Sequence, residues 1–365
     1  MGLMSPDLRV VLFGYGLAGR VFHSPLISAT PGLRITGIVT ADEERRAQAL
    51  QDHPGIRLFA TSEEALAKID EFDLAVIAGA NVTHFPLAMA SVANGWSVVV
   101  DKPLAPSAER AQEILEAAEA AGVQVHPFQN RRWDSDFLTL RALVENEPIG
   151  TPHRFESRIE RLRISPRGSW RESADPADLG GVLLDFGAHL VDQAIELLGP
   201  IVEVRAWARS VRYAGLAPDD MAITAFHENG AVSELIGSQA AAFGEPRYTL
   251  FATRGGVRVV GSDTQEAALR AGISANSADW GVEAADFTAT VVTPNESEEL
   301  ISREVALVRG RWNEYYPSVR DSILGHGLPP VPVTDVVANM RVLDAAAQSA
   351  RTGETARLSP PAAHE

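Results

Sequence analysis

Short apolar runs alternate with helical patterns through the first third of the chain. The expected strands are residues 8–13, 33–40, 56–59, 74–78, 97–100 and 123–127. The helical patterns between them cover residues 21–29, 42–51, 62–69, 84–94 and 107–121. Strands that alternate with helices in this way are typical of a parallel sheet with crossover connections. We therefore expect an α/β Rossmann domain, with a doubly wound parallel sheet, over residues 1–127.

The pattern changes after residue 128, where apolar and polar positions begin to alternate one by one. Such alternation indicates antiparallel strands with one exposed face. It covers residues 153–163, 202–211, 221–227 and 231–239. Helical patterns cover residues 136–145, 183–198 and 336–350, whereas the acidic stretch 262–300 is expected to be loop and edge structure. We expect an α+β second domain with a mostly antiparallel sheet over residues 128–335.

Length and composition fit this division. The chain has 365 residues, more than most single cores hold, and is 45% hydrophobic and 22% charged, as is ordinary for globular proteins. Cysteine is absent, which excludes thiol catalysis, thiolate metal sites and disulfides. No spacing of His, Asp and Glu residues suggests a metal site, so we expect none.

Charge and hydropathy bear on the partners. The formal net charge of −16 argues against nucleic acid, because phosphate binding needs clustered Lys and Arg side chains. No apolar run approaches the roughly 20 residues that a membrane span needs. Residues 1–8 have neither the charged start nor the apolar stretch of a secretion leader. We expect a cytoplasmic protein that binds neither nucleic acid nor membrane.

A glycine-rich turn follows the first expected strand directly. Its residues are Gly14, Tyr15, Gly16, Leu17, Ala18 and Gly19. In a dinucleotide-binding turn, the first glycine permits the tight bend, the second lets the backbone approach a pyrophosphate, and the third lets helix and strand pack closely. The following helix start faces the phosphates. The alternative is a tight turn that binds no ligand, but the strand–turn–helix context favours a dinucleotide.

The end of the second strand bears on which dinucleotide binds. An NAD site usually has an acidic residue there, which holds the ribose hydroxyls. Here the strand ends at Thr40, which cannot repel a 2′-phosphate, and Arg45 and Arg46 follow. These residues favour NADP(H) over NAD(H), although the acidic residues 42–44 argue the other way. A solvated helix start would also account for all of them.

Two further places carry candidate chemistry. Lys102 ends the fifth strand, at the sheet edge where doubly wound folds bind ligands, and Pro103 fixes its local backbone. Asp185 and His189 are four residues apart on the expected helix and share one face. An imidazole can take the proton from an alcohol while its hydride leaves. The alternatives are an exposed lysine at a strand end and a structural Asp–His pair.

The stretch after the sixth strand mixes amide, guanidinium, indole and carboxylate side chains. Asn130, Arg131 and Trp133 lie within it. This set suits the hydroxyls and faces of sugars and polyols, so the three residues are candidate substrate ligands. A hydrogen-bonded corner between the domains is an equally good interpretation.

Together these residues resemble the Gfo/Idh/MocA oxidoreductases, the family of glucose–fructose oxidoreductase and the inositol dehydrogenases. The resemblance spans nearly the whole chain. Beyond the glycine turn it rests on Asn81-Val82-Thr83-His84, Asp101-Lys102-Pro103, the Asp185 to His189 spacing and Leu328-Pro329-Pro330-Val331-Pro332-Val333. Residues 130–139, 170–172, 244–248 and 265–272 are similar to the branch that contains the NADP-dependent scyllo-inositol dehydrogenase.

The resemblance implies roles for these residues. Lys102 and His189 would be the catalytic pair, with His189 as general base in oxidation and general acid in reduction, and Asp185 would bind a substrate hydroxyl. Asn81 and His84 would belong to the cofactor site. The family also implies that the second domain's sheet is open-faced and forms a homodimer or homotetramer. It implies that the helix 336–350 returns to the nucleotide domain.

Three places differ from the family's pattern. Asp101 stands where the family has Glu before Lys-Pro, and Gly79-Ala80 stands where it has Thr-Pro. Ile159 and Leu162 replace tyrosines of the scyllo-inositol branch. If those aromatic rings line the sugar pocket, substrate choice differs in this chain.

The sequence therefore predicts an NAD(P)-dependent dehydrogenase that acts on a CH–OH group of a cyclic polyol or sugar of the inositol type. One alternative is a reductase of a keto-sugar of the anhydrofructose type. Another is a non-catalytic NAD(P)-binding regulator of sugar metabolism. Lys102 together with His189 favours an enzyme, because a regulator needs no base.

Overall fold

The computed structural model describes residues 7–244, 246–261 and 263–358 and divides into two compact units. Unit 1 comprises Met1–Asn130, Gln265–Trp280 and Arg311–Val336, and unit 2 comprises Arg131–Thr264, Gly281–Gly310 and Val337–Glu365. The expectation that residues 1–8 form no secretion leader concerns mostly residues 1–6, which lie outside the described part. Within the described residues, no helix combines the length and the apolar character needed to cross a membrane.

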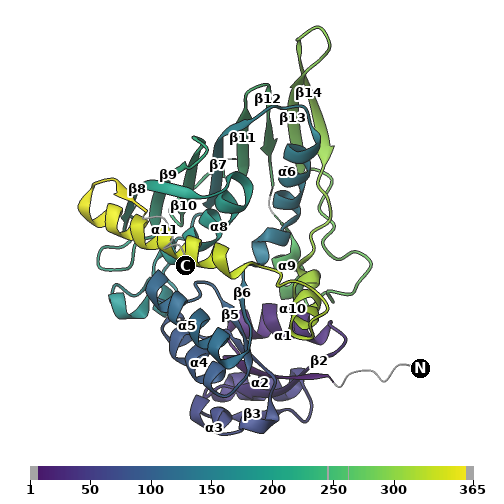
Figure 1. Cartoon of the computed structure of the whole chain (residues 1–365), viewed down its shortest axis with the longest axis vertical. Helices are drawn as coiled ribbons and strands as arrows, with labels where there is room; N and C mark the ends of the chain where they lie inside the picture. The colour runs from purple at the N-terminus through teal and green to yellow at the C-terminus, as the bar shows by residue number, and fades with distance from the viewer. Residues whose placement is uncertain (1–6, 245, 262, 359–365) are drawn as a thin grey trace. The chain divides into compact units, whose positions relative to one another are not determined.

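The sheet of unit 1 has six parallel strands in the order β3-β2-β1-β4-β5-β6 (Figure 1). The strands are β1 (Leu8–Phe13), β2 (Leu33–Val39), β3 (Arg57–Phe59), β4 (Leu74–Ile77), β5 (Ser97–Asp101) and β6 (Val125–Phe128). This is the strand order of the doubly wound dinucleotide-binding fold. The predicted fold class of the first domain is confirmed.

Helices connect these strands in the expected places. They are α1 (Ser24–Ser28), α2 (Glu43–Asp52), α3 (Ser62–Leu66), α4 (Asn81–Ala93) and α5 (Ala108–Ala121), with a π-helix η1 (Ala18–His23) leading into α1 and a 3₁₀ turn η2 (Ile69–Glu71). The central strands have no exposed faces, since every residue of β4 is buried. Such burial explains why these strands read as unbroken apolar runs.

Two segments that the sequence placed in the second domain belong to unit 1. They contain α9 (Gln265–Arg270), η6 (Trp312–Glu314), α10 (Tyr315–Ile323) and the start of α11 (Val333–Thr352). Phe22 of η1 contacts Trp312 edge to face, with 6.0 Å between ring centroids. The hydroxyl of Tyr315 donates to the carbonyl of Pro127 over 2.9 Å. These contacts join residues far apart in sequence, which local patterns do not show.

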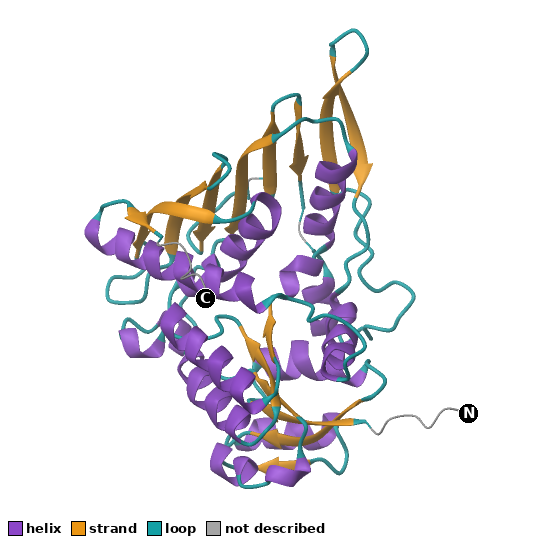
Figure 2. Cartoon of the chain, viewed as in Figure 1, coloured by secondary structure: helices purple, strands orange, loops and turns teal. Residues whose placement is uncertain are grey.

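The sheet of unit 2, whose strands are drawn in orange in Figure 2, has nine strands in the order β14-β13-β12-β11-β7-β10-β9-β8-β15. The strands are β7 (Pro152–Glu160), β8 (Ile201–Arg209), β9 (Asp220–His227), β10 (Val232–Ser238), β11 (Tyr248–Ala252), β12 (Gly255–Val259), β13 (Thr288–Pro294), β14 (Leu300–Ala306) and β15 (Ala356–Arg357). Only the β7–β10 pair is parallel among these described strands. The mostly antiparallel sheet is confirmed.

Helices cover one face of this sheet. They include α6 (Ser135–Asn146) against β12 and β13, and α8 (Gly187–Leu198) against β7 and β10. Met221, Ile223 and Ala225 alternate along β9 on the buried face, whereas Phe226 is exposed. The shorter elements of this unit are α7 (Val182–Asp185) and the 3₁₀ turns η3 (Asn130–Trp133), η4 (Trp170–Glu172) and η5 (Pro176–Asp178). The opposite face carries exposed apolar side chains such as Trp207.

The structure differs from the sequence expectations at two places outside the domain boundaries. The stretch 262–300 was expected to be loop and edge, but it contains α9, β13 and the start of β14. Every residue of β14 has some exposure, so no apolar alternation marks this edge strand. The expected helix 183–198 is broken at Phe186 into α7 and α8.

The final helix lies mostly within unit 2. Its residues from Val337 onward group with that unit, whereas the family resemblance implies that the helix returns to the nucleotide domain. There Asn339 donates to the carbonyl of Ala188 over 2.9 Å, and the hydroxyl of Ser349 accepts from the amide of Ala206 over 2.9 Å. Buried hydrogen bonds of this kind hold the helix to unit 2.

Candidate active site

The three glycines of the turn after β1 play three different roles. Gly14 has a φ of +96°, and a Cβ there would lie 3.1 Å from the carbonyl of Ala78. A Cβ on Gly19 would collide with the carbonyl oxygen of Gly14. A Cβ on Gly16 would meet no backbone among the described residues, its chain neighbours aside. The atoms within 4 Å of it would all belong to the Arg45 side chain. The turn thus leaves open backbone at its second glycine, as a pyrophosphate requires.

The other residues of the turn differ in what they present. The hydroxyl of Tyr15 donates to Asp52 of α2 over 2.9 Å, and Nε of Arg20 donates to the same carboxylate over 2.8 Å. Burial, together with the hydrogen bond to Asp52, raises the pKa of Tyr15. The Tyr15 ring therefore anchors the turn to α2, while Leu17 is exposed and Ala18 is buried.

The predicted selectivity residues follow β2. Thr40 is buried, and its carbonyl accepts a hydrogen bond from Nη1 of Arg46 over 3.1 Å. The carboxylate of Asp42 caps α2 by accepting the amide of Arg45 over 2.9 Å. The exposed guanidinium of Arg45 lies 3.7 Å from the Cβ position of Gly16. Arg45 is therefore the cation beside the glycine turn, whereas Arg46 is tied to the backbone.

A hydrogen bond joins the motif at the start of α4 to the motif at the end of β5. Nδ1 of His84 and the carbonyl oxygen of Pro103 are 2.7 Å apart. The amide of Lys102 donates to Oδ1 of Asp101 over 2.8 Å, and the Lys102–Pro103 peptide bond is cis. Asn81, the first residue of α4, is buried, and Lys102 is half-buried. Unit 1 thus brings the predicted residues of 81–84 and 101–103 together.

Buried titratable side chains surround Asp101. Nδ1 of His23 lies 2.6 Å from the hydroxyl of Tyr316. Burial lowers the pKa of His23 to about 4, and the charge of Asp101 opposes this shift. Burial also raises the pKa of Tyr315 and of Tyr316. Neither tyrosine is predictable from the sequence, because no motif or local period links residues 315 and 316 to β5.

Asp185 and His189 flank the break between α7 and α8. Asp185 ends α7 and is half-buried, while His189 lies in the first turn of α8 and is buried. Asp185 lines a small pocket together with Arg171 and Arg212. Burial lowers the pKa of Arg163, and the charge of Asp185 opposes that shift. Unit 2 therefore presents a carboxylate among guanidinium groups close in sequence to a buried imidazole.

The predicted substrate residues at 130–133 form the turn η3. Asn130 is buried and Trp133 is half-buried. Nη1 of Arg131 donates to Oδ2 of the buried Asp134 over 2.9 Å. The carbonyl of Arg131 accepts from Nε2 of the Gln193 side chain over 3.0 Å, and Gln193 lies one helical turn after His189. The turn thus supports α8, which the motif alone did not reveal.

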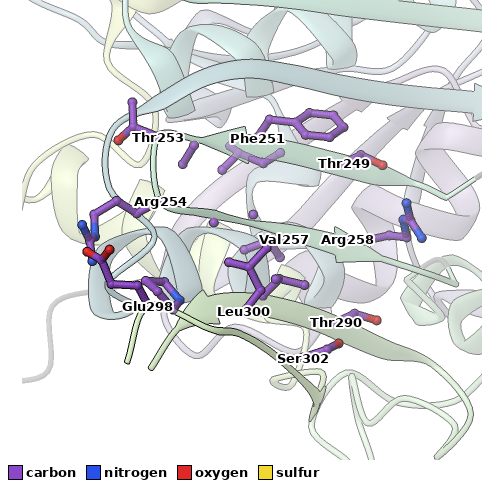
Figure 3. Close-up of a pocket in the computed structure, with 16 residues that line it drawn as sticks. Thr249, Phe251, Thr253, Arg254, Val257, Arg258, Thr290, Glu298, Leu300 and Ser302 are labelled. Carbon is purple, nitrogen blue, oxygen red and sulfur yellow. The ribbon is translucent and has the colours of Figure 1, made fainter. Parts of the chain in front are cut away.

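A groove of about 710 Å³ lies elsewhere in unit 2, on strands β11 to β14 (Figure 3). Thr249, Phe251 and Thr290 line it, on the face opposite to the buried Leu250 and Val291. None of the predicted site residues lines this groove. The groove belongs to the open face of the sheet.

Comparisons with known proteins agree with this geometry. Residues 8–129 match the model of the oxidoreductase family with an NAD-binding Rossmann fold (GFO_IDH_MocA), and residues 137–258 match the GFO/IDH/MocA C-terminal domain. Uncharacterized oxidoreductase YdgJ of Escherichia coli strain K12 is 34% identical over 98% of this chain and 100% of its own length.

Two further likenesses span the chain. The scyllo-inositol 2-dehydrogenase (NADP(+)) IolW of Bacillus subtilis strain 168 is 28% identical over 96% of both proteins. The crystal structure of an oxidoreductase from Bacillus cereus has a TM-score of 0.87 at 25% identity, covering 96% of this chain and 100% of the other. The similarity in sequence and the similarity in fold thus both extend over the two units of the chain.

Proposed function

Because the chain belongs to the Gfo/Idh/MocA family of NAD(P)-binding oxidoreductases, we propose that it is an NADP(H)-dependent dehydrogenase of a cyclic polyol or sugar. The hydride moves between the nicotinamide and a carbon that bears a hydroxyl. The observation that carries the proposal is the pair Asp185 and His189, a carboxylate and an imidazole on either side of the α7–α8 break.

The glycine turn fits a dinucleotide. The open backbone at Gly16 would hold the pyrophosphate, and the guanidinium of Arg45 beside it would hold a 2′-phosphate. Thr40 offers that phosphate no negative charge. Asn81 and His84, at the start of α4, belong to the same end of the sheet. When bound, the nicotinamide accepts or donates the hydride.

Three residues carry the proton and the hydroxyl chemistry. His189 takes the proton from the reacting hydroxyl in oxidation and returns it in reduction. The ammonium of Lys102 orients the reacting oxygen and stabilises negative charge on it. Asp185 accepts a hydrogen bond from a neighbouring hydroxyl, with Asn130, Arg131 and Trp133 as further substrate contacts.

A relative and the side chains of the site both favour a polyol as substrate. The name of IolW specifies scyllo-inositol and NADP(+), and that protein is similar to this chain over almost its full length. A carboxylate among guanidinium groups also suits a polyol, whose hydroxyls both donate and accept. Reduction of a keto-sugar uses the same residues in the reverse direction. A regulator that binds NAD(P) without catalysis would not require His189.

The open face of the second sheet supports self-association. Trp207, Phe226 and Leu300 are exposed on strands of this sheet. An apolar face of this kind suits a homodimer or a homotetramer built through the sheet. Sedimentation of the wild type and of the Trp207→Glu variant tests this part: dissociation of the variant supports it, and a monomeric wild type contradicts it.

An absorbance assay tests the function itself. NADPH and NADH, and their oxidised forms, are offered with a panel of inositols, aldoses and keto-sugars. We expect turnover with at least one inositol or keto-sugar and faster turnover with the NADP pair. Cofactor binding without turnover on any of them would favour the regulator.

A further inference from the structure

We propose that His84 is a positioning residue, which holds Lys102 in place through the carbonyl of Pro103. This inference rests on the proposed function, in which Lys102 meets the reacting oxygen. It assigns the His84 ring a role through the protein backbone rather than through contact with the dinucleotide.

The ring of His84 is hydrogen-bonded to the loop after β5. It is 1% exposed, and its Nδ1 lies 2.7 Å from the carbonyl oxygen of Pro103. A carbonyl oxygen only accepts hydrogen bonds, so Nδ1 must carry the proton that is shared. Burial lowers the pKa of His84. The hydrogen bond to Pro103 does not depend on this shift, because Nδ1 can carry a proton in both the neutral and the charged ring.

The other side of Lys102 is held as well. Its amide donates to Oδ1 of Asp101 over 2.8 Å, so a hydrogen bond restrains the backbone just before the side chain and another restrains it just after. Asp101 is shorter than glutamate, and its carboxylate accepts the hydrogen bond from the backbone amide of Lys102. His84 then supplies the restraint that comes from a different element, α4.

The start of α4 gives this restraint a rigid base. Thr83 donates from its hydroxyl to the carbonyl of Ala80 over 2.7 Å, and the amide of Thr83 bonds to the same carbonyl over 2.8 Å. His84 follows on a helix of 13 residues. A donor on a helix can hold a loop carbonyl more firmly than a donor on another loop.

The chain's lysine content makes the position of Lys102 measurable without turnover. The sequence has two lysines, Lys68 and Lys102, so amine acylation reports on only two side chains besides the N-terminus. Lys68 precedes the turn η2 in a different part of unit 1 and serves as the internal reference. Brief acylation with acetic anhydride, followed by mass spectrometry, gives the Lys102 to Lys68 reactivity ratio.

Three variants separate positioning from packing. His84→Leu removes the donor, and His84→Asn keeps an N–H close to the position of Nδ1. His126→Leu is the matched control, because His126 is also fully buried in unit 1 and its ring nitrogens have no hydrogen-bond partner among the described residues. Circular dichroism and the unfolding temperature confirm that each variant is folded.

The expected result has two parts. In His84→Leu the half-buried Lys102 becomes more accessible, so its reactivity ratio rises at least about threefold, and kcat falls by about tenfold to a hundredfold. NADPH affinity changes by less than about threefold, because the glycine turn and Arg45 are untouched. In His84→Asn the reactivity ratio and kcat both return most of the way to their wild-type values. His126→Leu behaves as the wild type.

An unchanged reactivity ratio in folded His84→Leu would overturn the proposal, as would an equal change in His126→Leu. Loss of NADPH affinity with an unchanged ratio would instead assign His84 to direct cofactor contact and would also overturn it. Should the wild type turn over no substrate of the panel, the proposed function fails, whereas the acylation ratio still decides the positioning of Lys102.

Discussion

The guanidinium of Arg132 forms a bidentate ion pair with the carboxylate of Asp192 inside unit 2. Nε donates to Oδ2 over 2.8 Å, and Nη2 donates to Oδ1 over 2.7 Å. Glu196 approaches Nε of the same arginine at 3.0 Å. Asp192 follows His189 by three residues on α8, so this ion pair fixes the helix that carries the proposed base. It assigns Asp192 to support rather than to substrate binding.

Breaking this pair should destabilise the protein strongly. Arg132→Met leaves the buried Asp192 carboxylate without its cation, for which we expect a loss of about 3 to 5 kcal/mol in the free energy of unfolding. Arg141→Met is the control, because Arg141 contacts the same Glu196 but is 38% exposed, and its loss should stay near 1 kcal/mol or below. Urea titration measures both, and equal losses would contradict the assignment.

The fold was predictable where burial leaves a local period. Central strands of unit 1 such as β4 are buried on both faces and read as apolar runs, whereas β8, β9 and β10 alternate because one face is covered. The edge strand β14 buries no residue and therefore gave no signal. The break at Phe186 was not visible either, since the apolar positions of α7 and α8 continue in phase.

The site was predictable only in part. Spacing alone identified Gly14, Gly16 and Gly19, and a Cβ on Gly14 or Gly19 would crowd neighbouring backbone, whereas Gly16 has open space. The bond between His84 and Pro103 spans 19 residues, and the tyrosines near Asp101 come from the far end of the chain. Such partners are set by tertiary packing, so no local pattern specifies them.

Arg45 should decide which cofactor binds. Arg45→Ala removes the cation beside Gly16, and the lost charge-assisted contact, about 1.5 to 3 kcal/mol, predicts a roughly tenfold to hundredfold loss of NADPH affinity. NADH affinity should hardly change, because NADH has no 2′-phosphate. Fluorescence titration with both cofactors measures this. The control is Arg46→Ala, and equal losses for NADPH and NADH in Arg45→Ala would refute the role.

Two buried histidines should make the protein sensitive to acid. The pKa of His23 and that of His126 are each lowered to about 4 by burial. An unfolded histidine has a pKa of about 6.5, so between these values the unfolded chain binds protons that the folded chain does not. Stability is fully present above about pH 6.5 and falls as the pH drops toward 4.

The size of this effect can be measured on one residue. Between pH 7 and pH 5, each histidine should contribute about 2 kcal/mol to the loss in free energy of unfolding. His126→Leu should therefore lose about 2 kcal/mol less than the wild type over this interval, by urea titration at both values. Identical losses in the two proteins would show that His126 does not titrate in this way.

The most direct test of the account is turnover by the His189→Ala variant, with NADPH binding measured on the same preparation. We expect kcat to fall by at least about a hundredfold, since a positioned acid–base group contributes that much. NADPH affinity should stay within about threefold of the wild type, because unit 1 holds the dinucleotide. A variant that binds NADPH normally and turns over at the wild-type rate would contradict the proposal that His189 moves the proton.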